Sequence, residues 1–508
     1  MRTFEILLLL ADLMAFLALS VPQRRGGLWM RHWPAIASVM AVAQWWAEGP
    51  RWQMLPAYAL TLLFLLLWLH RNFASRGTPP EQKRRLPIVA AAANGLGALG
   101  LAFAVALPMM VPVFSFPSPT GPYAIGTLTY HWVDAARSEV FVADPKARRQ
   151  LMVQIWYPAQ AHSPGPLAAY MPDADAVTTA FARIHDKPAF VFGHFKYVTT
   201  HAKSSAPAAV DQPRYPVLLF LEGATGFRQM NTFQVEHLVS HGYIVVAIDQ
   251  PGAAAAVVFP GGYQADSLTV PQFHSMVRPS YMPGGTDPLK TGVLLPNGST
   301  LPDNSIIPYL AQDVSFTLDQ LAALNLADPN GILAGKLDLQ RVGVFGVSLG
   351  GIVAGEACRL DSRLRACLVM DAAMSIDVVK AGLAQPGMWI TRDADSMRLE
   401  RRRAGGWPDA EIKAHQSSMR AVYEGLPGDG YFVRVPGMFH SNFTDIARWT
   451  PLFRVLGLAG PIDEQRAHGI VNAYSLAFFD RHLLGRPAPL LNGTAKQYPE
   501  VLFESRRP

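Results

Sequence analysis

Apolar residues are concentrated in the first 115 positions of this chain, and this uneven distribution limits what the chain can fold into. Four apolar stretches lie there: Phe4–Val21, Trp33–Ala47, Met54–Leu69 and Leu86–Phe114. A helix needs roughly 20 apolar residues to cross a bilayer, so the second stretch must borrow flanking residues. We predict a bundle of about four transmembrane helices over residues 1–115. Two polar residues inside it, Asp12 and Asn94, are expected to hydrogen-bond between helices.

Lysine and arginine in the short loops predict the orientation of such a bundle, because basic loops stay in the cytoplasm. The loop between the second and third stretches has Arg51 offset by Glu48, whereas the loops on either side are strongly basic. Their basic residues are Arg24, Arg25 and Arg31, and Arg71, Arg76, Lys83, Arg84 and Arg85. The N-terminus and everything after Phe114 then lie outside the cytoplasm. In a second interpretation the first stretch is a cleaved signal peptide, with Ala18-Leu19-Ser20 as its cleavage site.

Composition excludes several other classes of protein. Half of the residues are hydrophobic and 16% are charged, against about 25% in an ordinary soluble domain. The formal charge is +6, but no basic stripe is interleaved with aromatic residues, so nucleic-acid binding is not expected. The two cysteines, Cys358 and Cys367, make neither a disulfide framework nor a metal motif. We expect both to be small buried residues, with one bridge as the alternative outside the cytoplasm.

After residue 115, short apolar strands come to alternate with helical patterns. The predicted strands are Thr127–Val133, Leu151–Tyr157, Pro216–Leu221, Tyr243–Asp249, Arg341–Phe345, Arg365–Met370, Gly387–Thr391 and Tyr431–Val435. Predicted helices include Thr232–His241, Ala311–Leu326, Leu349–Cys358 and Ala467–Leu484. This alternation is typical of an α/β fold with a doubly wound, mostly parallel sheet. We assign residues 116–508 to this domain, with a long insertion at about 251–308 that suits a lid or binding element.

The strongest motif in the domain is Gly346-Val347-Ser348-Leu349-Gly350. A predicted strand runs directly into it and a helix rich in Gly and Ala leaves it, which is the setting of a nucleophile elbow. A reactive serine must stand on a tight turn, clear of neighbouring side chains. Gly346 and Gly350 allow this because neither has a Cβ. We therefore predict that Ser348 is a catalytic nucleophile.

A nucleophilic serine needs a base, and the base needs an orienting carboxylate. In this fold the order along the chain is Ser, acid, His. His440 follows the last predicted strand through a Pro-Gly turn and is the predicted base. Two acids fit the order: Asp371 directly follows the strand Arg365–Met370, and Asp393 follows Gly387–Thr391.

Acyl transfer also needs hydrogen-bond donors for a tetrahedral oxyanion. One is the backbone N–H after the nucleophile, which belongs to Leu349 here, and the other comes from a loop after an early strand. The loop Glu222-Gly223-Ala224-Thr225-Gly226 follows Pro216–Leu221 and fits that place. Ala224 N–H is the candidate second donor. This chemistry requires neither a metal nor an organic cofactor.

Six segments between about Gly121 and the C-terminus match the pattern of one known family. They are Leu151–Pro158, Tyr215–Arg228, Leu238–Asp249, Val342–Gly351, Cys367–Met374 and Val435–Asp445. Together they resemble the platelet-activating-factor acetylhydrolases, the group of lipoprotein-associated phospholipases A2 and their bacterial relatives. The resemblance implies an α/β-hydrolase fold without a cofactor.

The resemblance also implies roles for individual residues. The family's acid follows the strand after the nucleophile helix, which favours Asp371 over Asp393. Its His-x-Asn-Phe signature corresponds to His440-Ser441-Asn442-Phe443, and its second oxyanion donor corresponds to Ala224. The family usually has His-Gly in the early loop, whereas this chain has Glu222-Gly223, a change that leaves the backbone donor intact.

These observations predict a membrane-anchored serine ester hydrolase with Ser348, Asp371 and His440 as its triad. Its catalytic domain is expected outside the cytoplasm, and its substrates are short-chain or oxidised acyl esters of phospholipids. One alternative keeps the enzyme class and changes the substrate to a lactone, a xenobiotic ester or a polyester, with the insertion shaping the pocket. A different class of function, a non-catalytic membrane-bound scaffold, would require an incomplete triad.

Overall fold

The computed structural model describes residues 1–20, 28–73, 87–281, 295–300 and 305–507. By contacts it divides into two compact units. One is Met1–Phe114 together with Trp449–Leu452, and the other is Ser115–Arg448 together with Phe453–Pro508. Six of the basic loop residues used to predict the orientation lie outside the described residues, namely Arg24, Arg25, Arg76, Lys83, Arg84 and Arg85.

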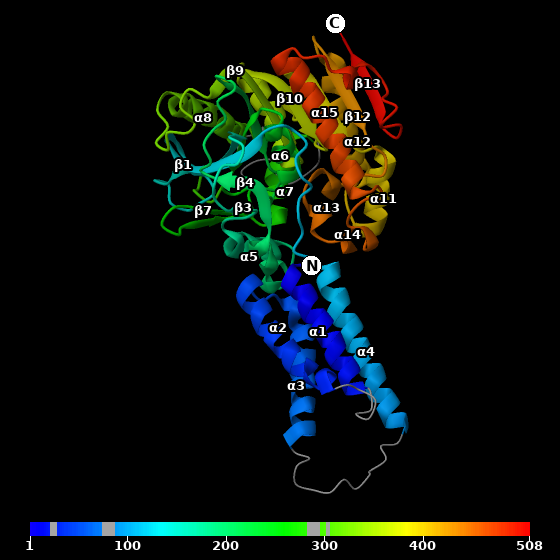
Figure 1. Ribbon diagram of the computed structural model, residues 1–508. Helices are drawn as coiled ribbons and strands as arrows, with labels where there is room; N and C mark the ends of the chain where they lie inside the picture. Colours follow the sequence, from blue (N-terminus) through cyan, green and yellow to red (C-terminus); the bar gives the residue numbers. More distant parts are fainter. Residues whose placement is uncertain (21–27, 74–86, 282–294, 301–304, 508) are drawn as a thin grey trace. The chain divides into compact units, whose positions relative to one another are not determined.

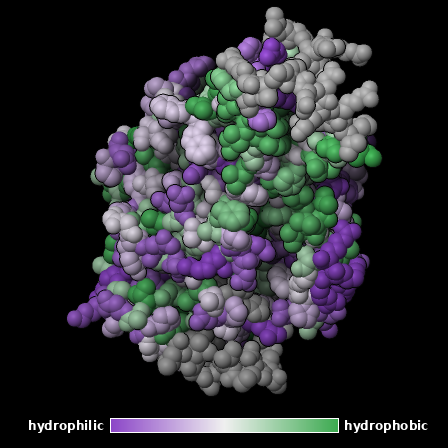
Figure 2. Space-filling model, turned by 90° about the horizontal axis from the view of Figure 1, so that it is seen from below, coloured by the Kyte–Doolittle hydropathy of each residue, from purple (hydrophilic) through white to green (hydrophobic). Residues whose placement is uncertain are grey.

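The first unit contains four α-helices, α1 (Thr3–Ser20), α2 (Trp33–Glu48), α3 (Leu55–Phe73) and α4 (Pro87–Met110), with short 3-10 turns η1 (Leu28–His32) and η2 (Trp52–Met54) (Figure 1). Within the described residues, three helical stretches are long and apolar enough to cross a membrane: Thr3–Ser20, Trp52–Phe73 and Ile88–Met110. Helix α2 has 16 residues and is not one of them. Many apolar side chains on these helices are exposed, and Figure 2 shows hydrophobic side chains gathered in the upper part of its view.

Polar side chains inside the helical unit hydrogen-bond between helices. Thr61 of α3 donates to Asp12 of α1 at 2.8 Å, and Ser20 of α1 donates to Asn94 of α4 at 3.1 Å. The expected role of Asp12 and Asn94 is therefore confirmed.

An ion pair joins the loop between α2 and α3 to helix α1. The Arg51 side chain is buried and forms a two-pronged ion pair with Glu5 of α1, at 2.7 and 2.9 Å. Glu48 lies 3.7 Å from Arg2. Helix α1 thus brings a carboxylate from far along the chain to Arg51.

The second unit is built on an eleven-stranded sheet with the order β13-β12-β11-β10-β9-β5-β6-β2-β1-β4-β3 (Figure 1). The six strands from β12 to β6 run parallel, and antiparallel strands extend the sheet at both ends. The strands are β1 (Ala124–Ser138), β2 (Arg148–Ala159), β3 (Leu167–Ala169), β4 (Thr199–Ser204), β5 (Tyr215–Leu221), β6 (Ile244–Asp249), β9 (Leu337–Val347), β10 (Leu364–Met370), β11 (Gly387–Thr391), β12 (Gly430–Arg434) and β13 (Leu502–Arg506). The predicted α/β architecture with a mostly parallel sheet is confirmed.

Two groups of helices cover the parallel strands. Helices α6 (Thr232–Ser240) and α15 (Glu464–Leu484) pack together in one group. The other group is a contiguous series of α8 (Ile307–Leu326), α9 (Leu349–Leu360), α10 (Ile376–Ala381) and α12 (Asp409–Gly425). Every residue of β5 is buried, as expected for a strand covered on both faces. Cys358 on α9 and Cys367 on β10 are buried free thiols, as predicted.

Several elements have no counterpart in the sequence-based prediction. The stretch 159–213 contains β3, α5 (Ala174–Ile184), the 3-10 segment η4 (Ala189–Tyr197) and β4. The insertion forms a hairpin, β7 (Ala256–Val258) and β8 (Gln264–Asp266), then α7 (Val270–Val277) and η5 (Arg278–Ser280). Its residues 282–294 and 301–304 lie outside the described residues. The remaining short elements are α11 (Ala394–Ala404), η6 (His440–Phe443), α13 (Ile446–Trp449), α14 (Leu452–Val455) and η7 (Pro489–Asn492).

Candidate active site

Ser348 occupies a strained turn between β9 and α9. Its backbone has φ 56° and ψ −122°, a conformation that residues other than glycine rarely adopt. The two glycines of the motif make the turn sterically allowed. A Cβ on Gly346 would lie 2.2 Å from the Gly350 carbonyl oxygen, and a Cβ on Gly350 would lie 2.0 Å from the Leu221 carbonyl oxygen. The turn therefore presents the Ser348 side chain at the carboxyl edge of the sheet, in the arrangement of a nucleophile elbow.

Asp371 and His440 are brought together at the same edge of the sheet. Asp371 directly follows β10 and its side chain is fully buried. His440 begins η6, beyond the end of β12. The distance between Asp371 Oδ2 and His440 Nδ1 is 2.5 Å. Since parallel strands end at one edge, residues 69 positions apart in the sequence meet there.

Two further residues hold the Asp371 carboxylate. Arg392 Nε lies 2.9 Å from its Oδ2, and the Thr391 hydroxyl donates to its Oδ1 at 3.0 Å. Arg392 also pairs with Glu400 on α11, and Glu400 accepts a hydrogen bond from the His440 backbone N–H at 3.2 Å. These contacts close a ring from Asp371 through Arg392 and Glu400 to His440, which restrains both the acid and the imidazole.

The electrostatic environment keeps the Asp371 carboxyl ionised. Its burial alone would raise the pKa. The Arg392 charge and the hydrogen bond from His440 oppose burial and hold the pKa of Asp371 well below its ordinary value. An ionised carboxylate at this position can accept the Nδ1–H of His440, which leaves Nε2 free to accept a proton from a nucleophile.

The alternative acid, Asp393, has a different set of contacts. Its side chain accepts a hydrogen bond from the Ser396 backbone N–H at 3.1 Å and caps the N-terminus of α11. Asp residues are favoured at this position because the carboxylate satisfies an otherwise unbonded helical N–H group. Asp371, and not Asp393, makes the hydrogen bond to His440.

The early loop after β5 lies against the elbow. A Cβ on Gly223 would come within 3.3 Å of Ser348 Cβ, so the loop backbone passes close to the serine. Within the described part of the chain, the N–H groups of Ala224 and Leu349 make no hydrogen bond to another residue. Two backbone donors beside Ser348 are thus available to an oxygen atom of a bound molecule.

A cavity of about 300 Å³ opens beside these groups. Ser348, Asp371, His440, Ala224 and Leu349 all line it. Its other walls include Val277 and Tyr281 from the middle of the insertion and Trp407, Glu411 and His415 from the region of α12. The five residues that the sequence predicted for the site therefore lie around one cavity.

Several residues of the site were not predicted from the sequence. Arg392 and Thr391 stand at the end of β11, where the sequence analysis considered only Asp393. Arg392 directly follows that strand, and its position at the carboxyl edge of the sheet could have indicated it. The buried His415, whose pKa is lowered to about 4 mainly by burial, and Trp407, whose ring lies 5.6 Å from that of His440, come from a helical region without a motif. No sequence signal pointed to them.

Residues 110–266 match the family model described as platelet-activating factor acetylhydrolase, isoform II. The platelet-activating factor acetylhydrolase of Canis lupus familiaris is 25% identical over 313 residues, which cover 58% of this chain and 62% of the canine protein. A protein of Arthroderma benhamiae named probable 1-alkyl-2-acetylglycerophosphocholine esterase is 24% identical over 415 residues, covering 77% of this chain and 94% of that protein. This chain thus matches less than two thirds of the canine protein's length.

A solved structure supports the same fold. The ferulic acid esterase from Streptomyces cinnamoneus superimposes with a TM-score of 0.56 and 27% sequence identity. The alignment covers 77% of this chain and 99% of the esterase. The large mostly parallel sheet and this likeness together identify an α/β-hydrolase fold.

Proposed function

We propose that this chain is a serine-dependent carboxylic ester hydrolase of the platelet-activating factor acetylhydrolase family, whose model matches residues 110–266 and whose curated members include its relatives. The observation that carries the proposal is the contact of His440 Nδ1 with Asp371 Oδ2 at 2.5 Å beside a cavity that Ser348 also lines. A serine, a histidine and an orienting carboxylate are the three side chains that acyl transfer by a catalytic triad requires.

The reaction begins when the Ser348 hydroxyl oxygen attacks the ester carbonyl carbon. His440 Nε2 takes the hydroxyl proton as the C–O bond forms, and the carbonyl oxygen becomes an oxyanion. The N–H groups of Leu349 and Ala224 donate hydrogen bonds to that oxyanion. Collapse of the intermediate breaks the ester C–O bond, and His440 returns its proton to the leaving alkoxide.

Water then completes the cycle. It attacks the acyl-enzyme carbonyl carbon, again with His440 as the base, and the acid product leaves as Ser348 regains its proton. Throughout both halves of the reaction, Asp371 accepts the Nδ1–H of His440, fixes the tautomer and stabilises the imidazolium. Arg392 keeps Asp371 ionised and oriented, and so acts through the acid.

Replacement of Ser348 tests the chemistry. Ser348→Ala is expected to abolish hydrolysis of p-nitrophenyl acetate and labelling by a fluorophosphonate probe, because both need the hydroxyl. Ser441→Ala is a matched control, since Ser441 neighbours His440 but its hydroxyl donates to the Leu458 carbonyl. Full turnover by Ser348→Ala would contradict the proposal. Failure of the wild-type chain to react with the probe would instead favour a non-catalytic scaffold.

The proposed substrates are phospholipids with a short or oxidised acyl chain. The names of the canine and fungal relatives refer to acetyl esters of this kind. The cavity volume of about 300 Å³ is at the small end for ligand pockets, which suits a short acyl group better than a long one. A series of phospholipids with acyl chains of 2 to 16 carbons should therefore give kcat/KM values that fall steeply with length.

We propose aromatic esters as a second substrate class, because aromatic side chains line the cavity. Val277 and Tyr281 face the cavity together with Trp407, so two aromatic rings line it. The solved relative is named as an esterase of ferulic acid, which is itself aromatic. Comparison of methyl ferulate with an acetyl ester of similar reactivity distinguishes the two classes. Faster turnover of the ferulate would favour the aromatic ester.

We also propose that α1 to α4 span a bilayer and that residues 116–508 lie outside the cytoplasm. Three of the stretches are long and apolar enough by themselves. Arg51 is paired with Glu5, so the loop between α2 and α3 carries little free positive charge, whereas Arg31 and Arg71 belong to the basic loops. Basic loops remain in the cytoplasm, which gives the proposed orientation.

Cysteine labelling on intact cells tests this orientation. The native Cys358 and Cys367 are buried, so an introduced cysteine should dominate the signal. Ser118→Cys, in the exposed linker before β1, is expected to react with a membrane-impermeant maleimide on intact cells. Ser75→Cys, in the third loop, should react only after permeabilisation. The opposite pattern would reverse the proposed orientation.

A further inference from the structure

We propose that Glu222 is held as a neutral carboxylic acid and positions the oxyanion loop by tying it to a buried network of charges behind the site. The inference rests on the proposed function, because it assigns a role to the residue that precedes Gly223 and Ala224. Glu222 stands where the resembled family usually has histidine.

Glu222 connects the two halves of the proposed oxyanion site. It lies directly after β5, and 1% of its surface is exposed. Its backbone carbonyl packs against the elbow, where a Cβ on Gly350 would come within 2.6 Å of it. The next residue, Gly223, passes beside Ser348. A shift of Glu222 therefore moves the backbone that carries the Ala224 N–H.

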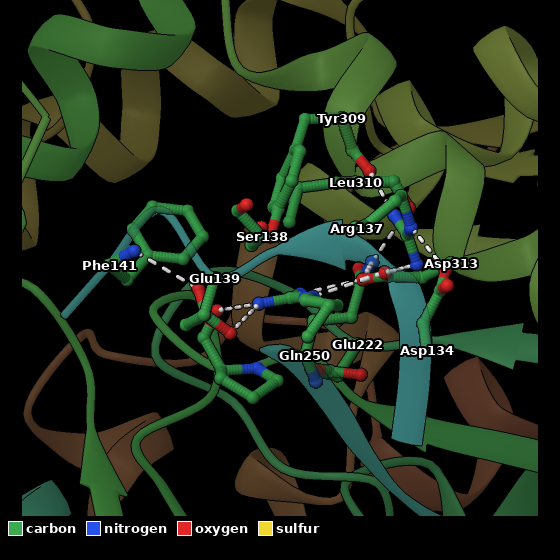
Figure 3. Close-up of polar contacts among 12 residues, drawn as sticks. Asp134, Arg137, Ser138, Glu139, Phe141, Glu222, Gln250, Tyr309, Leu310 and Asp313 are labelled. Atoms are coloured by element: carbon green, nitrogen blue, oxygen red, sulfur yellow. Dashed lines mark hydrogen bonds and ion pairs between the residues drawn. The ribbon is translucent and has the colours of Figure 1, made fainter. Parts of the chain in front are cut away.

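The side chain of Glu222 points away from the cavity toward Gln250, after β6. Glu222 Oε1 accepts a hydrogen bond from the Gln250 backbone N–H at 3.2 Å. The Gln250 side-chain amide in turn donates to Asp313 Oδ2 on α8 at 2.8 Å and to the Leu310 carbonyl at 2.9 Å. Figure 3 shows Glu222 and Gln250 beside this group. The oxyanion loop is thereby linked to the network around Asp313.

The network beyond Gln250 already contains more carboxylates than cations. Arg149 contacts Asp313 at 2.6 Å and Glu139 at 2.9 Å. Arg137 contacts Asp313 at 2.7 Å, and both are labelled in Figure 3. Arg137 also pairs with Asp134 at 2.5 Å. Two guanidinium groups thus serve three carboxylates, and no cation of this network is left for Glu222.

The other charges that face Glu222 do not neutralise it either. Asp249, at the end of β6, is held by the backbone N–H and the guanidinium of Arg228, so that cation is already paired. Across the described residues, Glu222 Oε2 has no hydrogen-bond partner. Burial raises the pKa of Glu222 well above its ordinary value, and the Asp249 carboxylate raises it further. The neutral acid avoids the repulsion from Asp249 and Asp313 that an ionised carboxylate would meet.

Substitution separates the charge of Glu222 from its shape. Glu222→Gln keeps an oxygen for the Gln250 N–H and is neutral at every pH, so its kcat should stay within about twofold of wild type. Glu222→Ala removes the link and should lower kcat roughly 10- to 100-fold at unchanged KM, since a displaced oxyanion donor acts on the transition state. Glu236→Gln, another buried glutamate on α6, is the matched control and should keep wild-type kinetics.

The pH profile gives a readout that a purely structural role would not move. As pH rises, wild-type Glu222 ionises and kcat should fall on the alkaline side. Glu222→Gln should lack that fall. Loss of activity by Glu222→Gln at every pH, or an identical alkaline limb in both proteins, would overturn the inference.

Thermal unfolding of the full chain in detergent tests the neutral state without any turnover. Above the unfolded-state pKa of a glutamate, the unfolded chain releases the proton that the folded chain keeps, so wild-type stability falls with pH. The difference in Tm between Glu222→Gln and wild type should therefore become more positive from pH 5 to pH 8. A constant difference would overturn the assignment. Absence of wild-type esterase activity would instead remove the proposed function, so the two failures are distinguishable.

Discussion

At the scale of single residues, the most constrained group of the proposed site is the Asp371 carboxylate. Its oxygens contact three donors, His440 Nδ1, Arg392 Nε and the Thr391 hydroxyl, and the side chain has no exposed surface. An acid with so many donors cannot rotate freely. The imidazole that it orients is therefore directed toward the cavity by contacts that begin on three different strands.

The choice between the two acids is directly testable. Asp371→Asn is expected to lower kcat by roughly 10³- to 10⁴-fold, because the amide favours the wrong tautomer of His440. Asp393→Asn should keep kcat within about twofold, since Asn caps a helix about as well as Asp. Rates of p-nitrophenyl acetate hydrolysis measure both. Near-wild-type activity in Asp371→Asn together with an inactive Asp393→Asn would exchange their roles.

The contact of Arg392 with Asp371 predicts how the pH dependence of kcat/KM changes when Arg392 is replaced. Its charge lowers the pKa of Asp371, whereas burial raises it. Without the charge, as in Arg392→Gln, the pKa of Asp371 is lowered less, so Asp371 takes up a proton at a higher pH and kcat/KM falls earlier on acidification. Stability follows the same sign: the contribution of an ionised Asp371 is present above its unfolded pKa and is lost as pH falls, earlier in the variant. Profiles of kcat/KM from pH 4 to pH 8 measure the shift.

The control for this experiment is Arg401→Gln, on the same region of chain. Arg401 pairs with Asp409 near the surface and does not contact Asp371. Its profile should coincide with that of wild type. An acid limb that moves equally in both variants would mean that the shift comes from net charge rather than from the contact with Asp371.

At the scale of elements, the elbow depends on how closely β9, α9 and β5 approach one another. The backbone of β5 comes so near to α9 that position 350 has no room for a side chain. The same approach brings the loop after β5 against Ser348. Close packing of these three elements thus creates both the strained turn and the proposed oxyanion site.

Gly350→Ala should therefore be strongly destabilising. The added Cβ would lie 2.0 Å from the Leu221 carbonyl oxygen, and backbone shifts that relieve such overpacking cost about 1–3 kcal/mol or more. Activity should fall as well, because the shift moves Ser348 and the early loop. The midpoint of thermal unfolding in detergent, together with kcat, measures the two effects.

Gly425→Ala provides the comparison for that substitution. Gly425 ends α12, and a Cβ there would meet nothing within 4 Å. Replacing a helical glycine by alanine in open space should stabilise the chain by about 0.5–1 kcal/mol or leave it unchanged. A loss of stability as large as that of Gly350→Ala would show that the elbow is not specially crowded.

At the scale of the whole molecule, the buried charges behind the site join elements that are distant in the sequence. Arg149 on β2 has no exposed surface and contacts Asp313 on α8, Glu139 after β1 and the Pro251 carbonyl at the start of the insertion. One side chain thus joins the antiparallel part of the sheet, a helix and the insertion.

Arg149→Met is expected to destabilise the catalytic unit by about 3–5 kcal/mol, because it leaves Asp313 and Glu139 buried with too little positive charge. Arg398→Met should leave the thermal midpoint close to that of wild type, since Arg398 pairs with Asp395 and Asp409 at the surface. Thermal midpoints of the full chain in detergent measure both losses. Equal losses would mean that the buried network adds no more to stability than an exposed ion pair.

The sequence alone indicated the α/β class, the apolar N-terminal region and the residues Ser348, Asp371 and His440. These follow from local patterns: apolar runs set the strands, Gly346 and Gly350 mark a turn, and residues after parallel strands gather at one edge. The short elements between residues 159 and 213 were not predicted, because segments of so few residues carry little periodicity. Strand β13 was missed for the same reason.

Tertiary structure decided which side chains contact one another. Strand position alone left Asp371 and Asp393 as alternatives and the family resemblance favoured Asp371, whereas the folded chain brings Asp371 to His440 and makes Asp393 a helix cap. The ring through Arg392 and Glu400, the pairing of Arg51 with Glu5 and the link from Glu222 to Asp313 through Gln250 all join residues far apart in the chain. Local patterns report the conformation of neighbouring residues, whereas such contacts depend on how strands and helices pack.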